Sequence, residues 1–191
     1  MNSHIILCSG GARSGKSEFA ESLALSQNGR KGYIATGQAF DEEMKDRISK
    51  HKARRGTLWN NYEIPLHITK YWDTVSADCD IILIDCLTMY TSNYIFDYGS
   101  LENQAACNEV EAIIMKEVDA LLGQIRKDGK TAIFVTNELG LGVVPENKLA
   151  RYFRDIAGRV NRQVATAADQ MYFTISGITI ELKAQEVTIH G

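Results

Sequence analysis

The chain has 191 residues, of which 45% are hydrophobic and 24% charged, and its formal net charge is −3. These values are ordinary for a soluble globular protein, and they lack the basic excess typical of chains that bind nucleic acid or membrane surfaces. No apolar run approaches the roughly 20 residues that a membrane-spanning helix needs, so no membrane span is predicted. The length favours one domain over residues 1–191 with a substantial core.

The first predicted elements are a buried strand over residues 4–8, a glycine-rich loop and a helix. The loop matches the phosphate-binding pattern G-x-x-x-x-G-K-[ST]. Its glycines keep bulk away from phosphates, and its N–H groups point at an anion near the positive end of the helix dipole. Lys16 is predicted to reach the β- and γ-phosphates. The predicted nucleotide contacts of the loop are Gly10, Gly11, Ala12, Arg13, Ser14, Gly15, Lys16 and Ser17.

A second strand is expected over residues 32–37, followed by a helix that Asp41 caps and that runs to Arg55. The helix ends in a run of cations around His51. One interpretation is a half-buried histidine at a solvated basic helix end, which the helix dipole favours. The other is that the cations bind phosphates and that His51 is a nucleophile toward phosphorus, since neutral imidazole forms covalent intermediates.

Residues 56–77 are expected to be irregular, and a third strand is predicted over residues 80–85. That strand is apolar until Asp85, as suits a parallel strand buried on both faces. Asp85 is therefore placed to hold Mg²⁺ opposite the Ser17 hydroxyl, and its alternative role is to cap the next helix.

The rest of the chain continues the alternation of strands and helices. Helices are predicted over residues 88–98, 104–127 and 146–168, and strands over 131–137, 171–176 and 178–183. Residues 185–189 are expected to pair with the last strand as an edge hairpin. This order predicts an α/β fold of the P-loop NTPase type, with a mainly parallel sheet flanked by helices and a C-terminal antiparallel edge hairpin. Ligands bind such sheets beyond the carboxyl ends of the strands, where Gly10, Thr36, Asp85 and Asn137 are expected to converge.

The four cysteines form no C-x-x-C pair, and Cys8 and Cys86 lie in apolar, strand-like runs. They indicate reduced packing residues in a cytoplasmic protein rather than a metal site. The predicted first strand begins almost at the N-terminus and leaves no room for a signal peptide.

Taken together, these segments resemble one family, the bifunctional adenosylcobinamide kinase / adenosylcobinamide-phosphate guanylyltransferases of cobalamin biosynthesis. The matching segments are residues 10–17, 33–36, 41–44, 47–48, 51–52, Trp59, Glu63, 135–138, 143–147 and 151–161. The phosphate loop alone is generic, whereas the segments around His51 and over residues 145–161 are specific. Lys50 stands where some relatives have a second histidine, and Asp85 where some have glutamate.

The resemblance implies two reactions. A nucleoside triphosphate, ATP or GTP, phosphorylates the aminopropanol hydroxyl of adenosylcobinamide; GTP then guanylylates a histidine, and the GMP passes to the new phosphate. The guanylylated histidine falls on His51, which makes His51 and Lys16 the expected catalytic residues. Beyond the loop, the nucleotide contacts fall on Thr36, Gly37, Gln38, Lys52, Ala53, Arg54, Arg55, Glu63 and Asp85. The resemblance also implies a homotrimer with the site near subunit boundaries. The residues themselves indicate Mg²⁺ as the metal, and the net charge of −3 predicts no nucleic acid as partner.

Two other functions remain open from the residues alone. A small-molecule kinase with the same loop would form no covalent intermediate, and His51 would be dispensable. A nucleotide-switched binding module would hydrolyse nucleotide slowly and have no small-molecule acceptor. The match over residues 145–161 favours the bifunctional enzyme over both.

Overall fold

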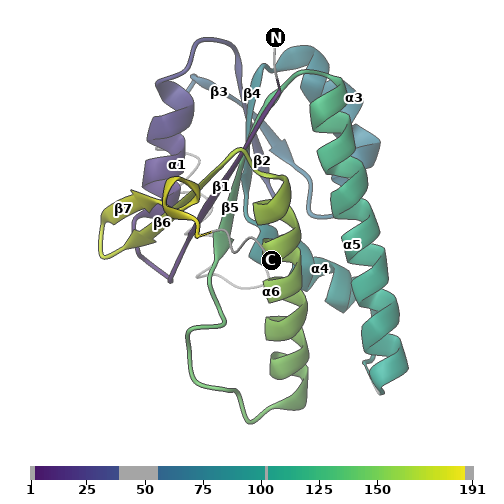
Figure 1. Ribbon diagram of the computed structural model, residues 1–191. Helices are drawn as coiled ribbons and strands as arrows, with labels where there is room; N and C mark the ends of the chain where they lie inside the picture. Colours follow the sequence, from purple (N-terminus) through teal and green to yellow (C-terminus); the bar gives the residue numbers. More distant parts are fainter. Residues whose placement is uncertain (1–2, 39–55, 102, 188–191) are drawn as a thin grey trace.

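A twisted sheet forms the centre of the computed structural model, which describes residues 3–38, 56–101 and 103–187 (Figure 1). Within this part of the chain the sheet has seven strands in the order β3-β2-β4-β5-β1-β6-β7. The strands are β1 His4–Gly10, β2 Lys31–Ala35, β3 Trp59–Glu63, β4 Ile81–Asp85, β5 Thr131–Asn137, β6 Gln170–Ile175 and β7 Ile178–Glu181. The pairs from β3 to β6 are parallel, and β6–β7 is antiparallel. The predicted α/β fold class is therefore confirmed.

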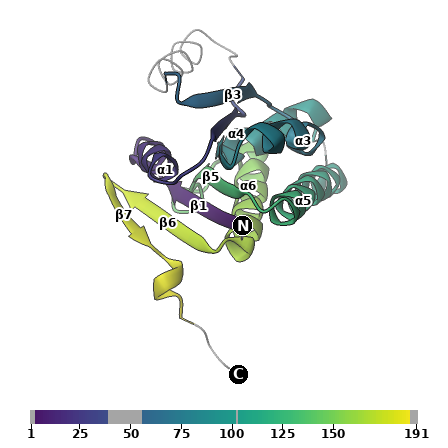
Figure 2. The ribbon, with the colours of Figure 1, turned by 90° about the horizontal axis from the view of Figure 1, so that it is seen from above.

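Helices cover both faces of this sheet. In the described part of the chain they are α1 Lys16–Leu25, α3 Ile68–Asp78, α4 Leu87–Tyr98, α5 Gln104–Lys127 and α6 Lys148–Ala167. Figure 2 shows α1 on one face and α3, α4, α5 and α6 on the other. Each layer has its own buried cluster: Ala20 and Ala24 of α1 pack on one face, and the α3–α6 helices enclose the larger cluster on the other. The predicted helix over residues 41–55 lies outside the described residues.

The prediction of an irregular stretch over residues 56–77 is wrong, because this stretch contains β3 and most of α3. β3 is a short edge strand, and among its residues Trp59 alone is buried. The N-terminus of α3 is capped from a distance, since the Ile68 N–H donates to the Tyr90 hydroxyl (3.0 Å) and the Thr69 N–H to a Glu117 oxygen (3.2 Å). The local sequence therefore gives little indication of β3 or of the start of α3.

The end of the chain also differs from the prediction. The antiparallel hairpin consists of β6 and β7, and Lys183–Gln185 forms a 3₁₀ turn rather than a strand. Residues 186–187 are not in a strand either, and residues 188–189 lie outside the described part. The edge hairpin is thus confirmed, while the pairing of residues 185–187 with it is wrong.

Candidate nucleotide site

The predicted phosphate loop connects β1 to α1 and folds back on itself. Arg13 (φ 58°) and Gly15 (φ 96°) take the left-handed backbone region, which turns the chain sharply before the helix. The Ser14 N–H donates to the Gly11 carbonyl (3.3 Å), and Lys16 Nζ donates to the same carbonyl (3.1 Å). Lys16 is thereby held across the mouth of the loop with 7% of its surface exposed.

The loop is also held by the β6–β7 turn, which sequence reasoning did not include in the site. A Cβ on Gly10 would lie 2.5 Å from the Thr174 carbonyl oxygen, so only glycine allows this approach. The Gly177 N–H donates to the Ser14 carbonyl (2.8 Å). The edge hairpin therefore fixes the position of the loop relative to the sheet.

The loop offers donors for an anion. The first residue of α1 is Lys16, and its N-cap, Gly15, provides no side-chain cap for the N–H groups that open the helix. Among the residues that the structure describes, the buried Ser14 Oγ has no hydrogen-bond partner. A phosphate at the positive end of the helix dipole would satisfy such groups.

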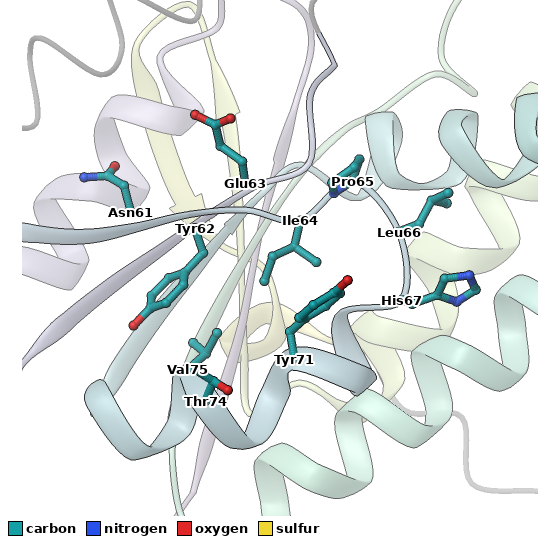
Figure 3. Close-up of a pocket in the computed structure, with 10 residues that line it drawn as sticks. All are labelled: Asn61, Tyr62, Glu63, Ile64, Pro65, Leu66, His67, Tyr71, Thr74 and Val75. Atoms are coloured by element: carbon teal, nitrogen blue, oxygen red, sulfur yellow. The ribbon is translucent and has the colours of Figure 1, made fainter.

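Strand alternation places the predicted acidic residues on the same face of the sheet as α1. The cluster under α1 contains Trp59 of β3 and Leu83 of β4. Side chains two residues apart on a strand share a face, so Glu63 and Asp85 also belong to this face. Figure 3 shows Glu63 on the opposite side of β3 from Tyr62 and Ile64. Ala35 of β2 pairs with both Glu63 and Asp85, which are thus two strand spacings apart, about 10 Å.

Asp85 is oriented by its neighbours at the carboxyl ends of the strands. The Tyr33 hydroxyl donates to Asp85 Oδ2 (2.8 Å). Thr36 Oγ1 accepts from the Cys86 N–H and donates to the Cys86 carbonyl, both at 2.8 Å. Asn93 Nδ2 holds the Thr36 carbonyl (2.7 Å). Tyr33 and Asn93 are residues that sequence reasoning missed, because their roles depend on contacts between elements distant in sequence.

Two further predicted contacts, Gly37 and Gln38, follow Thr36 and are half-buried. The Thr36 side chain is fully buried, and its hydroxyl is engaged with Cys86. The remaining predicted contacts, Lys52, Ala53, Arg54 and Arg55, lie outside the described residues, as does His51.

A cavity of about 550 Å³ lies beside β3 and α3, and Glu63 is among the residues that line it (Figure 3). Its walls include Tyr62, Ile64, Tyr71 and Val75, and no residue of the phosphate loop. This cavity therefore does not include the phosphate loop, and Glu63 is the predicted nucleotide contact that lines it.

The cysteines are free thiols. Burial raises the pKa of Cys8 to about 12, and burial followed by the Asp85 charge raises the pKa of Cys86 to about 11. Both are therefore protonated at neutral pH, in agreement with packing roles.

Within the described ranges, no cluster of three or more His, Cys, Asp or Glu side chains could hold a metal ion. Ser17 and Asp85 carry oxygen atoms of the kind that Mg²⁺ takes beside waters and phosphates, and their role as its ligands stays a prediction. None of the helices described is long and apolar enough to cross a membrane.

Comparison with known proteins decides among the P-loop families. Residues 6–182 match the model of a family described as cobinamide kinase / cobinamide phosphate guanyltransferase. The chain belongs to this family. The resemblance found in the sequence is therefore confirmed.

Similar proteins from three bacteria cover almost the whole chain. It is 38% identical over 181 residues to the bifunctional adenosylcobalamin biosynthesis protein CobU of Escherichia coli, spanning 94% of this chain and 99% of that one. It is 40% identical to CobU of Salmonella typhimurium over the same shares of the two chains. The bifunctional protein CobP of Pseudomonas aeruginosa is 36% identical over 92% of this chain and 95% of its own.

A solved structure supports the fold. The KaiC-like protein of Pyrococcus horikoshii aligns with 90% of this chain and 71% of its own, with a TM-score of 0.50 at 11% identity. At this identity the likeness concerns the fold alone, and it agrees with a P-loop sheet.

Proposed function

We propose that this protein is a bifunctional enzyme of cobalamin biosynthesis, an adenosylcobinamide kinase and adenosylcobinamide-phosphate guanylyltransferase. The observation that carries the proposal is the match of residues 6–182 to this family, in a chain whose Lys16 Nζ donates across the phosphate loop to the Gly11 carbonyl. A nucleoside triphosphate, ATP or GTP, and a corrinoid are its substrates.

In the kinase step, the hydroxyl of adenosylcobinamide attacks the γ-phosphorus, and the bond to the β-phosphate oxygen breaks. Phosphoryl transfer of this kind depends on positioning and charge stabilisation rather than on covalent chemistry by the protein. The loop N–H groups cradle the phosphates, and Lys16 neutralises charge on the β- and γ-phosphates. The Ser17 hydroxyl and the Asp85 carboxylate would hold Mg²⁺, which supplies further charge neutralisation when bound.

In the second step, neutral His51 attacks the α-phosphorus of GTP and pyrophosphate leaves. The phosphate of adenosylcobinamide phosphate then attacks the same phosphorus, the P–N bond breaks, and adenosylcobinamide-GDP forms. Arg47, Lys52, Arg54 and Arg55 supply cations next to His51 in the sequence, which would offset the phosphate charges. Glu63 lies on the α1 face with Asp85 and would accept hydrogen bonds from guanine or ribose.

We also propose that the protein acts in the cytoplasm as a homotrimer. The connection between β5 and α6 carries apolar side chains that are largely exposed in the single chain: Leu141 (80%), Val143 (94%) and Val144 (59%). Covering them in an interface between copies would remove this apolar surface from water. Size determination in solution tests the trimer.

The proposed function is tested with the purified chain, adenosylcobinamide, ATP or GTP, and Mg²⁺. Adenosylcobinamide phosphate should form first, and adenosylcobinamide-GDP and pyrophosphate should follow when GTP is present. Nucleoside diphosphate and inorganic phosphate as the only products would support a nucleotide-switched module instead. Phosphorylation without the GDP product would support a plain kinase.

A further inference from the structure

A group of buried and half-buried polar side chains holds the end of β5 beside the phosphate loop. Asn137, the last residue of β5, pairs in register with Gly10, the first residue of the loop. Its N–H donates to Thr88 Oγ1 of α4 (2.8 Å), and its carbonyl accepts from Asn161 Nδ2 of α6 (3.1 Å). The Glu138 N–H then donates to the Gly10 carbonyl (3.0 Å). The backbone of Asn137 is thus fixed from three sides.

The same group continues below the strand end. Thr136 Oγ1 donates to Asn161 Oδ1 (2.7 Å) and lies 3.2 Å from Thr88 Oγ1. Thr136 is fully buried, and Thr88 is 6% exposed. Buried polar groups cost stability unless every member is hydrogen-bonded, so apolar side chains would be the simpler way to fill this space. These side chains instead fix the backbone of Asn137.

Strand alternation gives the direction of the Asn137 side chain. Thr136 faces α4 and α6, where Phe134 belongs to the cluster of that face. Val135 belongs to the cluster under α1, and Asn137 therefore falls on the α1 face. This is the face of Asp85 and of the phosphate loop. Asn137 is half-buried, and among the residues that the structure describes no hydrogen-bond partner is found for its side-chain amide.

The strand order places the Asn137 side-chain amide between the phosphate loop and Asp85. β5 lies between β1, which leads into the phosphate loop, and β4, which ends in Asp85. Triphosphate bound on the loop, with its metal at Asp85, would have its terminal phosphate over the end of β5.

We propose that Asn137 is a catalytic residue that donates a hydrogen bond from Nδ2 to an oxygen of the γ-phosphate, and that Thr88 and Asn161 are positioning residues that aim it. This inference rests on the proposed function for the identity of the reaction, but its geometry concerns only the bound nucleotide. The bond is present with a triphosphate and absent with a diphosphate. It therefore contributes to discrimination between the two and to transfer of the γ-phosphoryl group.

The test compares binding of a non-hydrolysable GTP analogue and of GDP, each with Mg²⁺, by calorimetry on the full chain. Asn137→Ala should weaken binding of the analogue about tenfold, the usual size for a hydrogen bond to a charged group, and leave GDP binding within about twofold. Asn108→Ala, on the exposed face of α5, is the matched control and should change neither the affinity for the analogue nor the affinity for GDP. Equal weakening of both nucleotides, or of neither, would overturn the role of Asn137.

A second pair of variants tests the positioning. Thr88→Val keeps the shape of the side chain but removes the hydroxyl, and it should lose part of the preference for the analogue over GDP. Thr88→Ser keeps the hydroxyl and should retain this preference. In the double variant Thr88→Val/Asn137→Ala the preference should equal that of Asn137→Ala alone, because Thr88 acts through Asn137. A purely structural role would lower the melting temperature of Thr88→Val and leave its preference at the wild-type value, which would overturn the positioning.

These outcomes are independent of the proposed function. If the wild-type chain phosphorylates adenosylcobinamide and Asn137→Ala keeps the wild-type preference, only the role of Asn137 fails. If the wild-type chain shows no such activity but Asn137→Ala loses the preference, the proposed function fails and the γ-phosphate contact stands.

Discussion

The Tyr33 hydroxyl donates a 2.8 Å hydrogen bond to Asp85 Oδ2, and this bond joins the adjacent strands β2 and β4 at their carboxyl ends. It fixes the rotamer of the carboxylate on the α1 face. A carboxylate already held in one orientation loses less entropy when it binds a metal ion, so Tyr33 prepares Asp85 for its proposed role.

The metal role predicts a change that depends on magnesium. Asp85→Asn should weaken nucleotide binding about tenfold in the presence of Mg²⁺ and much less in its absence, because the amide is a poorer ligand. Tyr33→Phe should give a smaller loss with the same dependence. Titrations with and without Mg²⁺ measure both, with Asp73→Asn on the exposed side of α3 as control. Equal losses in the two conditions would indicate a capping or packing role.

The role of Lys16 predicts a large loss of the kinase reaction. Lys16→Ala removes a cation from the β- and γ-phosphates and should raise the barrier by about 3–4 kcal/mol, roughly a hundredfold or more in rate. Lys70→Ala, at an exposed position of α3, should leave the rate unchanged. Steady-state phosphorylation of adenosylcobinamide measures the effect. Near wild-type turnover by Lys16→Ala, with an unchanged melting temperature, would reject this role.

A stability prediction concerns Asp80, at the opposite end of the sheet. Hydrogen bonds from the Arg30 guanidinium and from the Arg30 N–H hold the pKa of Asp80 at about 2, below the ordinary 3.8. Because the folded-state pKa is depressed, the stabilisation is present above the ordinary value and is lost as pH falls through the folded value.

Asp80→Asn should therefore lower the free energy of unfolding by about 1 kcal/mol at neutral pH, a figure reduced for the partial exposure of the pair. The difference from wild type should shrink as pH falls from about 4 to about 2. Urea denaturation at several pH values measures it. A difference that stays constant over this range would contradict the assignment.

The parts of the fold that depend on local pattern were predictable from the sequence. The helix Gln104–Lys127 and the strand Thr131–Asn137 have the predicted bounds, because a long apolar stripe and a continuous apolar run each leave little choice of element. The phosphate loop is likewise a local motif, and its place between β1 and α1 follows from it.

The parts that depend on distant contacts were not predictable. The cap of α3 comes from Tyr90 and Glu117, the loop is held through Gly177, and Asp85 is oriented by Tyr33. In each case the two partners meet because the strand order brings their elements together. The sequence around either partner does not indicate the order of the strands in the sheet.

The central claim, a covalent guanylyl intermediate on His51, is tested most directly by incubating the purified chain with GTP and Mg²⁺ and measuring its intact mass, followed by mapping of the modified residue. The account predicts a gain of one GMP on His51, stable in base, released by acid, and absent from His51→Ala. His4→Ala should still form the adduct, and His51→Ala should keep much of its kinase activity because the Lys16 loop is unchanged. A wild-type chain that phosphorylates adenosylcobinamide but never gains GMP, or a His51→Ala variant that still gains it, would contradict the account.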